Sequence, residues 1–254
     1  MGADYSSREM MAIMAGRLIQ NGDILFAGTG IAILAAVTAK KIHAPQAVIF
    51  FETGGIDPSL TELPVSVADL RVMIGSSLNA GLIEAFSILG QRKLRTIAFL
   101  GAAQIDRFGN INSTSIGDYH HPRVRFPGSG GGCDAASMAS GTIIFMQHEK
   151  KKFVKKLDYL TSPGWLEGGE SRRECGLTRG GPIAVVTNLG LLRFKEETKE
   201  MYLSETYPGV RIEEVQAHTD FVLDGSRAIE SLPPTEKELK ILRQEVDPQR
   251  IILD

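Results

Sequence analysis

The sequence is poor in the features that mark secreted, membrane-spanning and metal-binding proteins. Its 254 residues include only two cysteines, Cys133 and Cys175, which form neither a Cys-x-x-Cys pair nor a metal-ligand spacing. A reduced, cytoplasmic setting is therefore expected. No signal-peptide pattern opens the chain. The longest apolar run, residues 31–39, is far shorter than the ~20 residues of a membrane-spanning helix, so no membrane partner is expected.

An excess of charge of one sign is also lacking. The formal net charge is −2 and the sequence pI is about 6.2, so a nucleic-acid partner, which usually needs a basic face, is not expected. The local exception is the basic run at residues 150–152 with Lys155 and Lys156. We interpret this run as the solvated face of a helix, with contact to an anion such as a phosphate as the alternative.

What is present suits a globular enzyme. Hydrophobic residues make up 43% of the chain and charged residues 23%, enough for a sizeable core. The length fits one large domain or at most two small ones, and a single domain over residues 1–254 is predicted because no low-complexity linker or internal repeat interrupts the chain.

Apolar runs alternate with helical patterns along most of the sequence. Two capping boxes, Ser6-x-x-Glu9 and Thr235-x-x-Glu238, predict helix starts, the second helix running to about Val246. Helical periodicity or apolar content predicts further helices at residues 31–41 and 82–89. Continuous apolar runs, which suit strands covered on both faces, predict strands at residues 24–26, 47–51, 96–100, 142–146 and 182–187.

The order of these elements predicts the fold class. Residues 182–187 and 191–194 flank Asn188-Leu189-Gly190, which resembles a hairpin, and residues 201–203 can extend it. Strand–helix alternation followed by a hairpin indicates an α/β fold, with an open, mostly parallel sheet flanked by helices and an antiparallel extension. The segment from Asp106 to Cys133 lacks apolar periodicity, and we expect it to be an ordered functional loop.

Glu52 is the first candidate for chemistry. It follows a buried apolar run directly, which places a carboxylate at the carboxyl end of a strand, where ligands bind in open α/β sheets. Gly54 and Gly55 follow, and glycines allow close approach to the backbone. On position alone, an ordinary turn whose Glu52 side chain points into solvent is the favoured interpretation.

Other motifs are weaker. Residues 128–132 contain four glycines, whose backbone amides could face a phosphate or an oxyanion, although a flexible loop is the alternative. The Gly28-Thr29-Gly30 motif lacks the third glycine of a dinucleotide fingerprint. His120-His121 invites a metal or general-base interpretation, but no third ligand has suitable spacing, so no metal site is predicted.

Motifs of one known family recur at residues 52–54, 101–106, 109–112 and 130–134, and with them the chain resembles the class I CoA-transferase β subunits. Glu52-Thr53-Gly54 resembles the Glu-Ser-Gly or Glu-Asn-Gly motif that carries the nucleophile. Residues 101–106 and 109–112 resemble the Gly-Ala-Gln-x-Asp and Gly-Asn-x-Asn segments of these subunits, and residues 130–134 match their Gly-Gly-Ala-Met-Asp segment. Residues 113–122, 146–150 and 159–165 are most similar to glutaconate CoA-transferase β subunits. The likeness runs from about Tyr5 to Pro248.

The resemblance implies a fold, a reaction and site residues. The fold would be the NagB-like fold of class I CoA-transferases. The reaction would move CoA from an acyl-CoA such as acetyl-CoA to a carboxylic acid, through a ping-pong mechanism with a CoA thioester on Glu52. No tightly bound cofactor is implied, since CoA enters as a thioester substrate. The implied catalytic residues are Glu52 and Gly131, and the implied CoA-binding residues are Gly54, Gly101, Ala102, Gln104, Gly130 and Gly132.

The resemblance also implies a partner. The oxyanion-hole motif of the α subunit is missing from this chain, so an α subunit would complete the enzyme as a hetero-oligomer. Thr53 departs from the family's Ser or Asn, which puts one CoA contact in doubt. Glutaconate or another dicarboxylate is the expected acid, with Arg71, Arg123 or Arg125 as candidates to bind its distal carboxylate. A CoA-thioester hydrolase of the ring-opening type, or a non-catalytic assembly subunit, remains the alternative.

Overall fold

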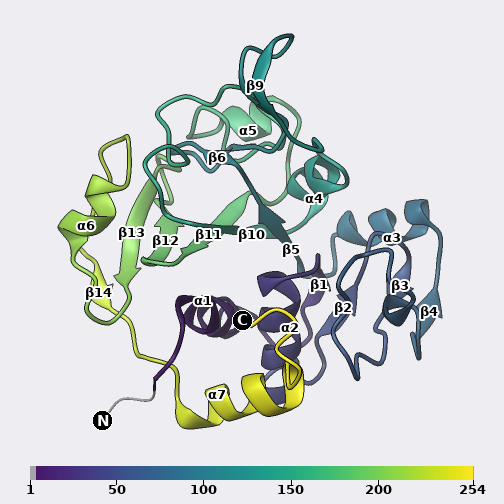
Figure 1. Cartoon of the computed structure of the whole chain (residues 1–254). Helices are drawn as coiled ribbons and strands as arrows, with labels where there is room; N and C mark the ends of the chain where they lie inside the picture. Colours follow the sequence, from purple (N-terminus) through teal and green to yellow (C-terminus); the bar gives the residue numbers. More distant parts are fainter. Residues whose placement is uncertain (1–3, 254) are drawn as a thin grey trace. The chain divides into compact units, whose positions relative to one another are not determined.

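The computed structural model describes residues 4–253 (Figure 1). The chain divides into two compact units. Unit 1 comprises Met1–Phe99 and Pro233–Asp254, and unit 2 comprises Leu100–Leu232. The prediction of a single domain over the whole chain stays a prediction. In the described part of the chain, no helix is long and apolar enough to cross a membrane.

Unit 1 contains a sheet with parallel strands at its centre. Strand β1 (Ile24–Phe26) lies between β2 (Val48–Phe50) and β5 (Thr96–Gly101) and is parallel to both. The short strands β3 (Gly55–Ile56) and β4 (Leu78–Asn79) continue it in antiparallel pairing beyond β2. The three apolar runs are largely buried, as expected for strands covered on both faces.

Three helical segments pack together in unit 1: α1 (Ser7–Arg17), α2 (Ile31–Ile42) and α7 (Glu236–Ile241), which continues as the π-helical segment η2 (Leu242–Val246). Both predicted capping boxes are confirmed at the starts of α1 and α7. The remaining helices of the unit are the single turn η1 (Leu70–Val72) and α3 (Leu82–Leu89).

Charged side chains attach α7 and η2 to α1. Arg243 of η2 donates to Glu9 at 2.6 and 2.9 Å, and Arg17 of α1 donates to Glu238 at 2.8 and 2.7 Å. Burial alone would raise the pKa of the Glu9 carboxyl, but hydrogen bonds from Arg243 and the Ser6 amide outweigh burial and hold that pKa below its usual value. The C-terminal helical segment is therefore joined to the first helix by charge as well as by packing.

Unit 2 contains the predicted hairpin and its extension. Strand β10 (Gly141–Met146) is parallel to β11 (Pro182–Thr187), and β12 (Gly190–Phe194) returns antiparallel to β11. Strand β13 (Met201–Thr206) is antiparallel to β12, which confirms the predicted extension, and the two-residue β14 (Ile229–Glu230) pairs parallel to β13. The predicted fold class is confirmed: parallel strands with an antiparallel extension, combined with helices.

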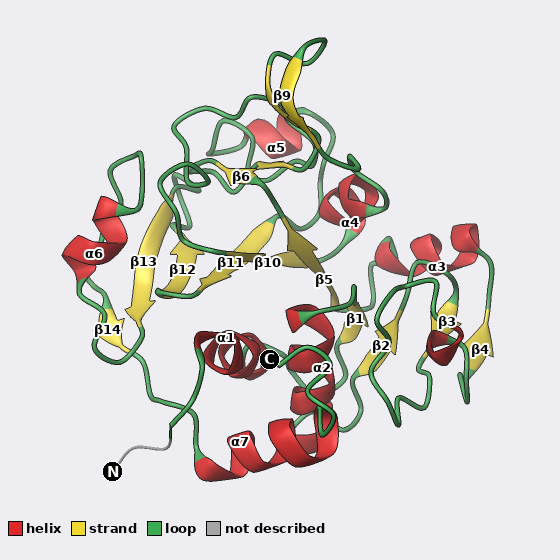
Figure 2. Cartoon of the chain, viewed as in Figure 1, coloured by secondary structure: helices red, strands yellow, loops and turns green. Residues whose placement is uncertain are grey.

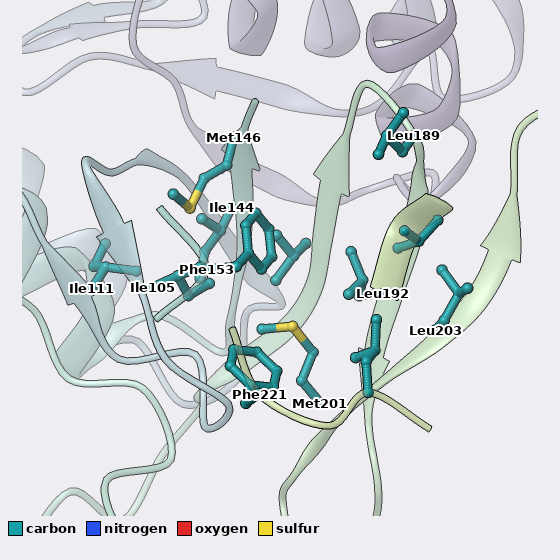
Figure 3. Packing of buried hydrophobic residues seen from close by; sticks show 13 residues of the cluster. Ile105, Ile111, Ile144, Met146, Phe153, Leu189, Leu192, Met201, Leu203 and Phe221 are labelled. Atoms are coloured by element: carbon teal, nitrogen blue, oxygen red, sulfur yellow. The ribbon is translucent and has the colours of Figure 1, made fainter. Parts of the chain in front are cut away.

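One face of this sheet covers a hydrophobic core (Figure 3). Side chains from β10, β11, β12 and β13 meet Ile105, Phe153 and Phe221 there. His148 is buried beside this core, its ring stacked on Phe153 with centroids 3.9 Å apart. Its ring nitrogens contact the hydroxyls of Thr187 and Thr219 at 3.2 and 2.9 Å. Burial, with a smaller contribution from His218, lowers the pKa of His148 to about 3, so the ring is neutral at pH 7.

The segment from Asp106 to Cys133 is ordered and carries short elements (Figure 2). These are β7 (Ile111–Asn112), which pairs with β6 (Gln104–Ile105), the hairpin of β8 (Ser115–Gly117) and β9 (Pro122–Arg125), and the start of α4 (Gly132–Met138). Two further short helices of unit 2 are α5 (Ser171–Glu174) and α6 (Ile212–Ala217).

The predicted helix face at the basic run is wrong. Residues 150–152 form a turn, Phe153 pairs with Ile105 in an isolated bridge, and residues 155–156 form a bend. The Glu149 carboxylate accepts from Lys151 and Lys152 at 2.9 and 2.6 Å. Hydrogen bonds from these lysines hold the pKa of Glu149 at about 2. Two lysines of the basic run thus pair with Glu149 within a turn, and the run contains no helix.

Candidate active site

Glu52 lies in the tight turn between β2 and β3. The Gly54 amide donates to the Phe51 carbonyl at 3.0 Å, and the Phe51 amide donates to the Gly55 carbonyl at 3.0 Å. Glu52 is thus one of the two central residues of a hydrogen-bonded turn, directly after a buried strand, and it is half-buried. The predicted position of this carboxylate at the carboxyl end of a parallel strand is confirmed.

Close contacts within the chain explain why positions 54 and 55, after Glu52, are glycines. Gly54 has φ of +103°, and a Cβ there would lie 1.9 Å from the Ala80 carbonyl oxygen. A Cβ on Gly55 would lie 1.9 Å from the Val72 carbonyl oxygen. Both glycines therefore permit the backbone of residues 72–80 to approach the turn. Contact between Gly54 and CoA stays a prediction.

Thr53, the residue that departs from the family motif, is used to hold the same turn. Its hydroxyl donates to the Val67 carbonyl at 2.9 Å. Together with the Ala80 amide, which donates to the Gly54 carbonyl at 3.0 Å, this bond ties the Glu52 turn to residues 67–80. The turn is thus supported from outside its own hairpin.

The glycine-rich loop of residues 128–132 leads into α4 in unit 2. Gly128 and Gly130 have positive φ, and a Cβ on either would meet open space. Ser129 holds the loop, because its carbonyl accepts from the Gly132 amide at 2.8 Å and its hydroxyl from the Cys133 amide at 2.9 Å. Among the described residues, the Gly131 amide has no hydrogen-bond acceptor. The Gly131 amide is therefore available to donate a hydrogen bond, as predicted for the amides of this loop.

The predicted CoA-binding residues of the β5–β6 region differ in their surroundings. Gly101 is exposed at the end of β5, and Ala102 is partly buried against the core of unit 2. Gln104 is buried, and its amide joins Asn112 at 2.8 Å and Asp158 at 3.2 Å. Its side chain thus organises neighbouring loops, while a role toward CoA stays a prediction for all three residues.

The candidate arginines for a distal carboxylate are partly occupied. Arg71 is paired with Asp69 at 2.7 Å and with Glu62 at 3.4 Å. Arg125 lies over the Tyr119 ring, 4.7 Å from its centroid, and donates to the Tyr119 carbonyl. Arg123 is exposed on β9. Binding of a distal carboxylate stays a prediction for each of them.

The adjacent histidines lie in the turn between β8 and β9. His120 and His121 are both exposed there, and Asp118 accepts from both backbone amides at 2.9 Å. Within residues 4–253, no group of three or more metal-ligating side chains occurs. The two histidines therefore belong to a turn that Asp118 stabilises.

Sequence reasoning misses Arg172, the largest fully buried side chain of the described residues. Its guanidinium donates to the carbonyls of Ala136 at 2.7 Å, Gly164 at 2.8 Å and Arg179 at 2.9 Å. Burial lowers its pKa to about 10, so it remains charged at pH 7. Arg172 thereby holds the last turn of α4, whose first turn follows the glycine loop. The neighbouring charged residues of the sequence give no signal that this arginine is buried.

Comparison with known proteins identifies the class that these features belong to. The coenzyme A transferase family profile matches residues 8–218, so the chain belongs to the coenzyme A transferase family. The resemblance inferred from its motifs is confirmed.

Individual relatives are similar over almost the whole chain. The chain is 44% identical to the B subunit of glutaconate CoA-transferase of Acidaminococcus fermentans, covering 96% of this chain and 94% of the relative. It is 38% identical to the B subunit of 3-oxoadipate CoA-transferase of Pseudomonas knackmussii, covering 94% and 92%. The crystal structure of glutaconate coenzyme A-transferase from A. fermentans superposes with a TM-score of 0.96 at 42% identity, covering 99% of this chain and 98% of that one. The chain is accordingly a CoA-transferase β subunit.

Proposed function

We propose that this chain is the catalytic β subunit of a CoA-transferase that carries CoA as a thioester on Glu52. The observation that carries the proposal is the position of Glu52, in the hydrogen-bonded turn that follows β2, within the segment that resembles the family's nucleophile motif. A half-buried carboxylate at a strand end is accessible to a substrate, yet its backbone is held by the bonds around Gly54 and Thr53.

The chemistry proceeds in two exchanges. The ionised Glu52 carboxylate attacks the carbonyl carbon of an acyl-CoA, which forms a mixed anhydride and releases CoA thiolate. The thiolate attacks the glutamyl carbonyl, which forms the Glu52–CoA thioester and releases the free acid. An acceptor carboxylate then attacks this thioester, and the same two steps run in reverse. Each complete exchange turns one thioester and one carboxylate into another thioester and another carboxylate, so it is nearly thermoneutral.

Each attack places negative charge on a carbonyl oxygen, which needs fixed donors. From the resemblance to the family, we propose the Gly131 amide as one donor and a group of the α subunit as another. Water would hydrolyse the anhydride and the thioester, so we propose that the α subunit also keeps water away from Glu52.

Similarity also guides the proposal on substrates and partner. Both relatives are named as B subunits, which supports an α subunit as the partner. The names of these relatives refer to glutaconate and 3-oxoadipate, two dicarboxylates, so we propose a dicarboxylate as the acid. We propose that CoA enters as a substrate and that no cofactor is tightly bound. We also propose that the enzyme is located in the cytoplasm.

Substitution of Glu52 tests the proposal. In the complex with its α subunit, Glu52→Gln removes the nucleophilic carboxylate at nearly constant size, and we expect CoA exchange between acetyl-CoA and a dicarboxylate to fall by about 10³-fold or more. Glu236→Gln is the matched control, since Glu236 is an exposed carboxylate in the first turn of α7 in the same unit, and its exchange rate should stay unchanged. Exchange by the Glu52→Gln complex at the unsubstituted rate would reject Glu52 as nucleophile. Release of acid and CoA without any acceptor would instead support the hydrolase alternative.

A further inference from the structure

Arg172 of α5 is a charged side chain buried without an acid beside it. It is 2% exposed, and among residues 4–253 no carboxylate forms an ion pair with it. Each hydrogen bond of its guanidinium ends on a main-chain carbonyl oxygen. A buried charge is costly unless its donors are satisfied, and here backbone carbonyls alone satisfy them. Arg172 therefore acts on the path of the backbone.

The carbonyls that accept from Arg172 come from three segments. One is the last turn of α4, through Ala136 at 2.7 Å and Ser137 at 3.4 Å. The second is residues 163–164, at 3.3 and 2.8 Å. The third is Arg179, whose carbonyl accepts from two nitrogens at 3.3 and 2.9 Å. The planar guanidinium, with its five N–H donors, joins all three segments at one point.

Two of these segments are closely packed and offer a fixed support for α4. The Gly164 amide donates to the Asn110 side chain at 2.8 Å, and a Cβ on Gly164 would lie 2.3 Å from the Gly109 carbonyl carbon. A Cβ on Gly180, which follows the third segment, would lie 2.0 Å from the Ala139 carbonyl oxygen. Such close backbone contacts leave little room for movement, so Arg172 attaches the end of α4 to a rigid part of unit 2.

Helix α4 transmits this attachment to Gly131. The helix is only about 10 Å long at 1.5 Å per residue, and the Ala135 amide donates to the Gly131 carbonyl at 2.9 Å. The other end of the glycine loop is held by Ser113, which accepts from the Gly128 amide at 3.0 Å and donates to the Gly128 carbonyl at 2.9 Å. The position of the Gly131 amide thus depends on Ser113 before it and on α4 after it.

We propose that Arg172 is a positioning residue for CoA transfer, which holds the Gly131 amide at the oxyanion by fixing the far end of α4. The inference rests on the proposed function, in which the Gly131 amide is an oxyanion donor. A donor misplaced by about 1 Å costs on the order of 10²-fold in rate, so a residue remote from the chemistry can control it. Lysine is no substitute, because its ammonium is a point donor and cannot serve three segments in one plane.

The first test replaces Arg172 in the complex with the α subunit. We expect Arg172→Lys to lower kcat for CoA exchange by about 10- to 100-fold. KM for the acyl-CoA should stay within about twofold, because an oxyanion donor acts in the transition state. Arg173→Lys is the matched control, since the neighbouring Arg173 side chain is 78% exposed, and its kcat should stay unchanged.

The second test asks whether Arg172 acts through Gly131. Gly131→Pro removes the N–H donor, and the fixed φ of proline near −65° is close to the −77° of Gly131. We expect this variant to lower kcat by about 10²-fold or more. Adding Arg172→Lys to it should lower kcat by less than about twofold further, because no donor is left to position. Losses that multiply in the double variant would show that Arg172 does not act through this amide.

The remaining outcomes separate the role of Arg172 from the proposed function. Far-UV circular dichroism and co-purification with a tagged α subunit verify that each variant is folded and assembled. Unchanged kcat in folded Arg172→Lys overturns the inference, while loss of activity in Gly131→Pro leaves the proposed function standing. Normal exchange by Gly131→Pro rejects the donor itself and the role of Arg172 with it. Arg172→Gln replaces a lysine variant that does not fold, and failure of both to fold assigns Arg172 to the fold alone.

Discussion

Gly54 is the residue on which the geometry of the Glu52 turn depends most directly. Its φ of +103° is a conformation that other residues rarely adopt, and the Ala80 carbonyl occupies the place of a side chain. Any side chain there must displace either the turn or residues 72–80. The second glycine of the pair, Gly55, stands equally close to Val72. Two independent close approaches thus fix the backbone beside Glu52.

We expect Gly54→Ala to lower the free energy of unfolding by about 1–3 kcal/mol, because it adds backbone strain and a clash with Ala80. Gly28→Ala is the matched control at the end of the neighbouring strand β1, since its Cβ meets open space, and it should change stability by less than about 0.5 kcal/mol. Urea unfolding of the three proteins measures both values. Equal stability of the two variants would show that the Ala80 contact does not restrain the turn.

The sequence predicts less about the contacts of individual residues than about the positions of helices and strands. The position of Glu52 follows from a buried apolar run in front of it, which is local information. A glycine is needed at position 54 because the Ala80 carbonyl lies against it. The buried Gln104 side chain is satisfied by hydrogen bonds with Asn112 and Asp158. Contacts between residues so far apart in the chain leave no periodic pattern, so the sequence alone explains the glycines only by ligand approach.

Among the helices and strands, the two helices that begin with capping boxes, α1 and α7, are the most predictable from the sequence. They also contact each other in unit 1 through Arg17 and Glu238. The capping boxes at Ser6 and Thr235 fix where α1 and α7 begin. Their ion pairs then join the first and last helical segments of the chain. By contrast, β3 and β4 are two residues long, and α4 is hidden in a glycine-rich sequence, so neither alternation nor helical spacing reveals them.

We expect Arg243→Met to lower the free energy of unfolding by about 2 kcal/mol, because it leaves the buried Glu9 carboxylate without its charged donor. The exposed pair of Lys41 and Glu245, at 3.2 Å, offers a comparison. Lys41→Met should cost less than about 1 kcal/mol, because solvent screens that pair. Thermal and urea unfolding give both values, and similar losses in the two variants would contradict the importance of burial at Glu9.

For the whole molecule, sequence reasoning reaches the fold class and the family, since both depend on many residues at once. It does not reach the division of the chain into two compact units, because no linker composition marks Phe99 or Leu100. Nor does it reveal the buried polar groups of unit 2. His148 and Arg172 have the ordinary appearance of surface residues in the sequence, and only the packing around them shows otherwise.

The burial of His148 predicts how stability depends on pH. A folded-state pKa of about 3, against an ordinary value of 6.5, means that the unfolded chain binds the proton more readily, so stability falls as the pH drops below 6.5. Between pH 7 and pH 5 this one group should cost about 2 kcal/mol. His148→Gln removes the titrating ring, and its stability should fall less over the same interval, although it starts lower. Parallel pH dependence of the two proteins in urea unfolding would contradict a buried neutral His148.

The thioester on Glu52 can be tested directly by borohydride reduction. The complex of this chain with its α subunit is incubated with an acyl-CoA and then treated with sodium borohydride, which reduces an enzyme–CoA thioester to an alcohol. The account predicts inactivation only when acyl-CoA is present, with the change in mass located on the peptide that contains Glu52. Inactivation that does not depend on acyl-CoA, or a modification on any other residue, would contradict it.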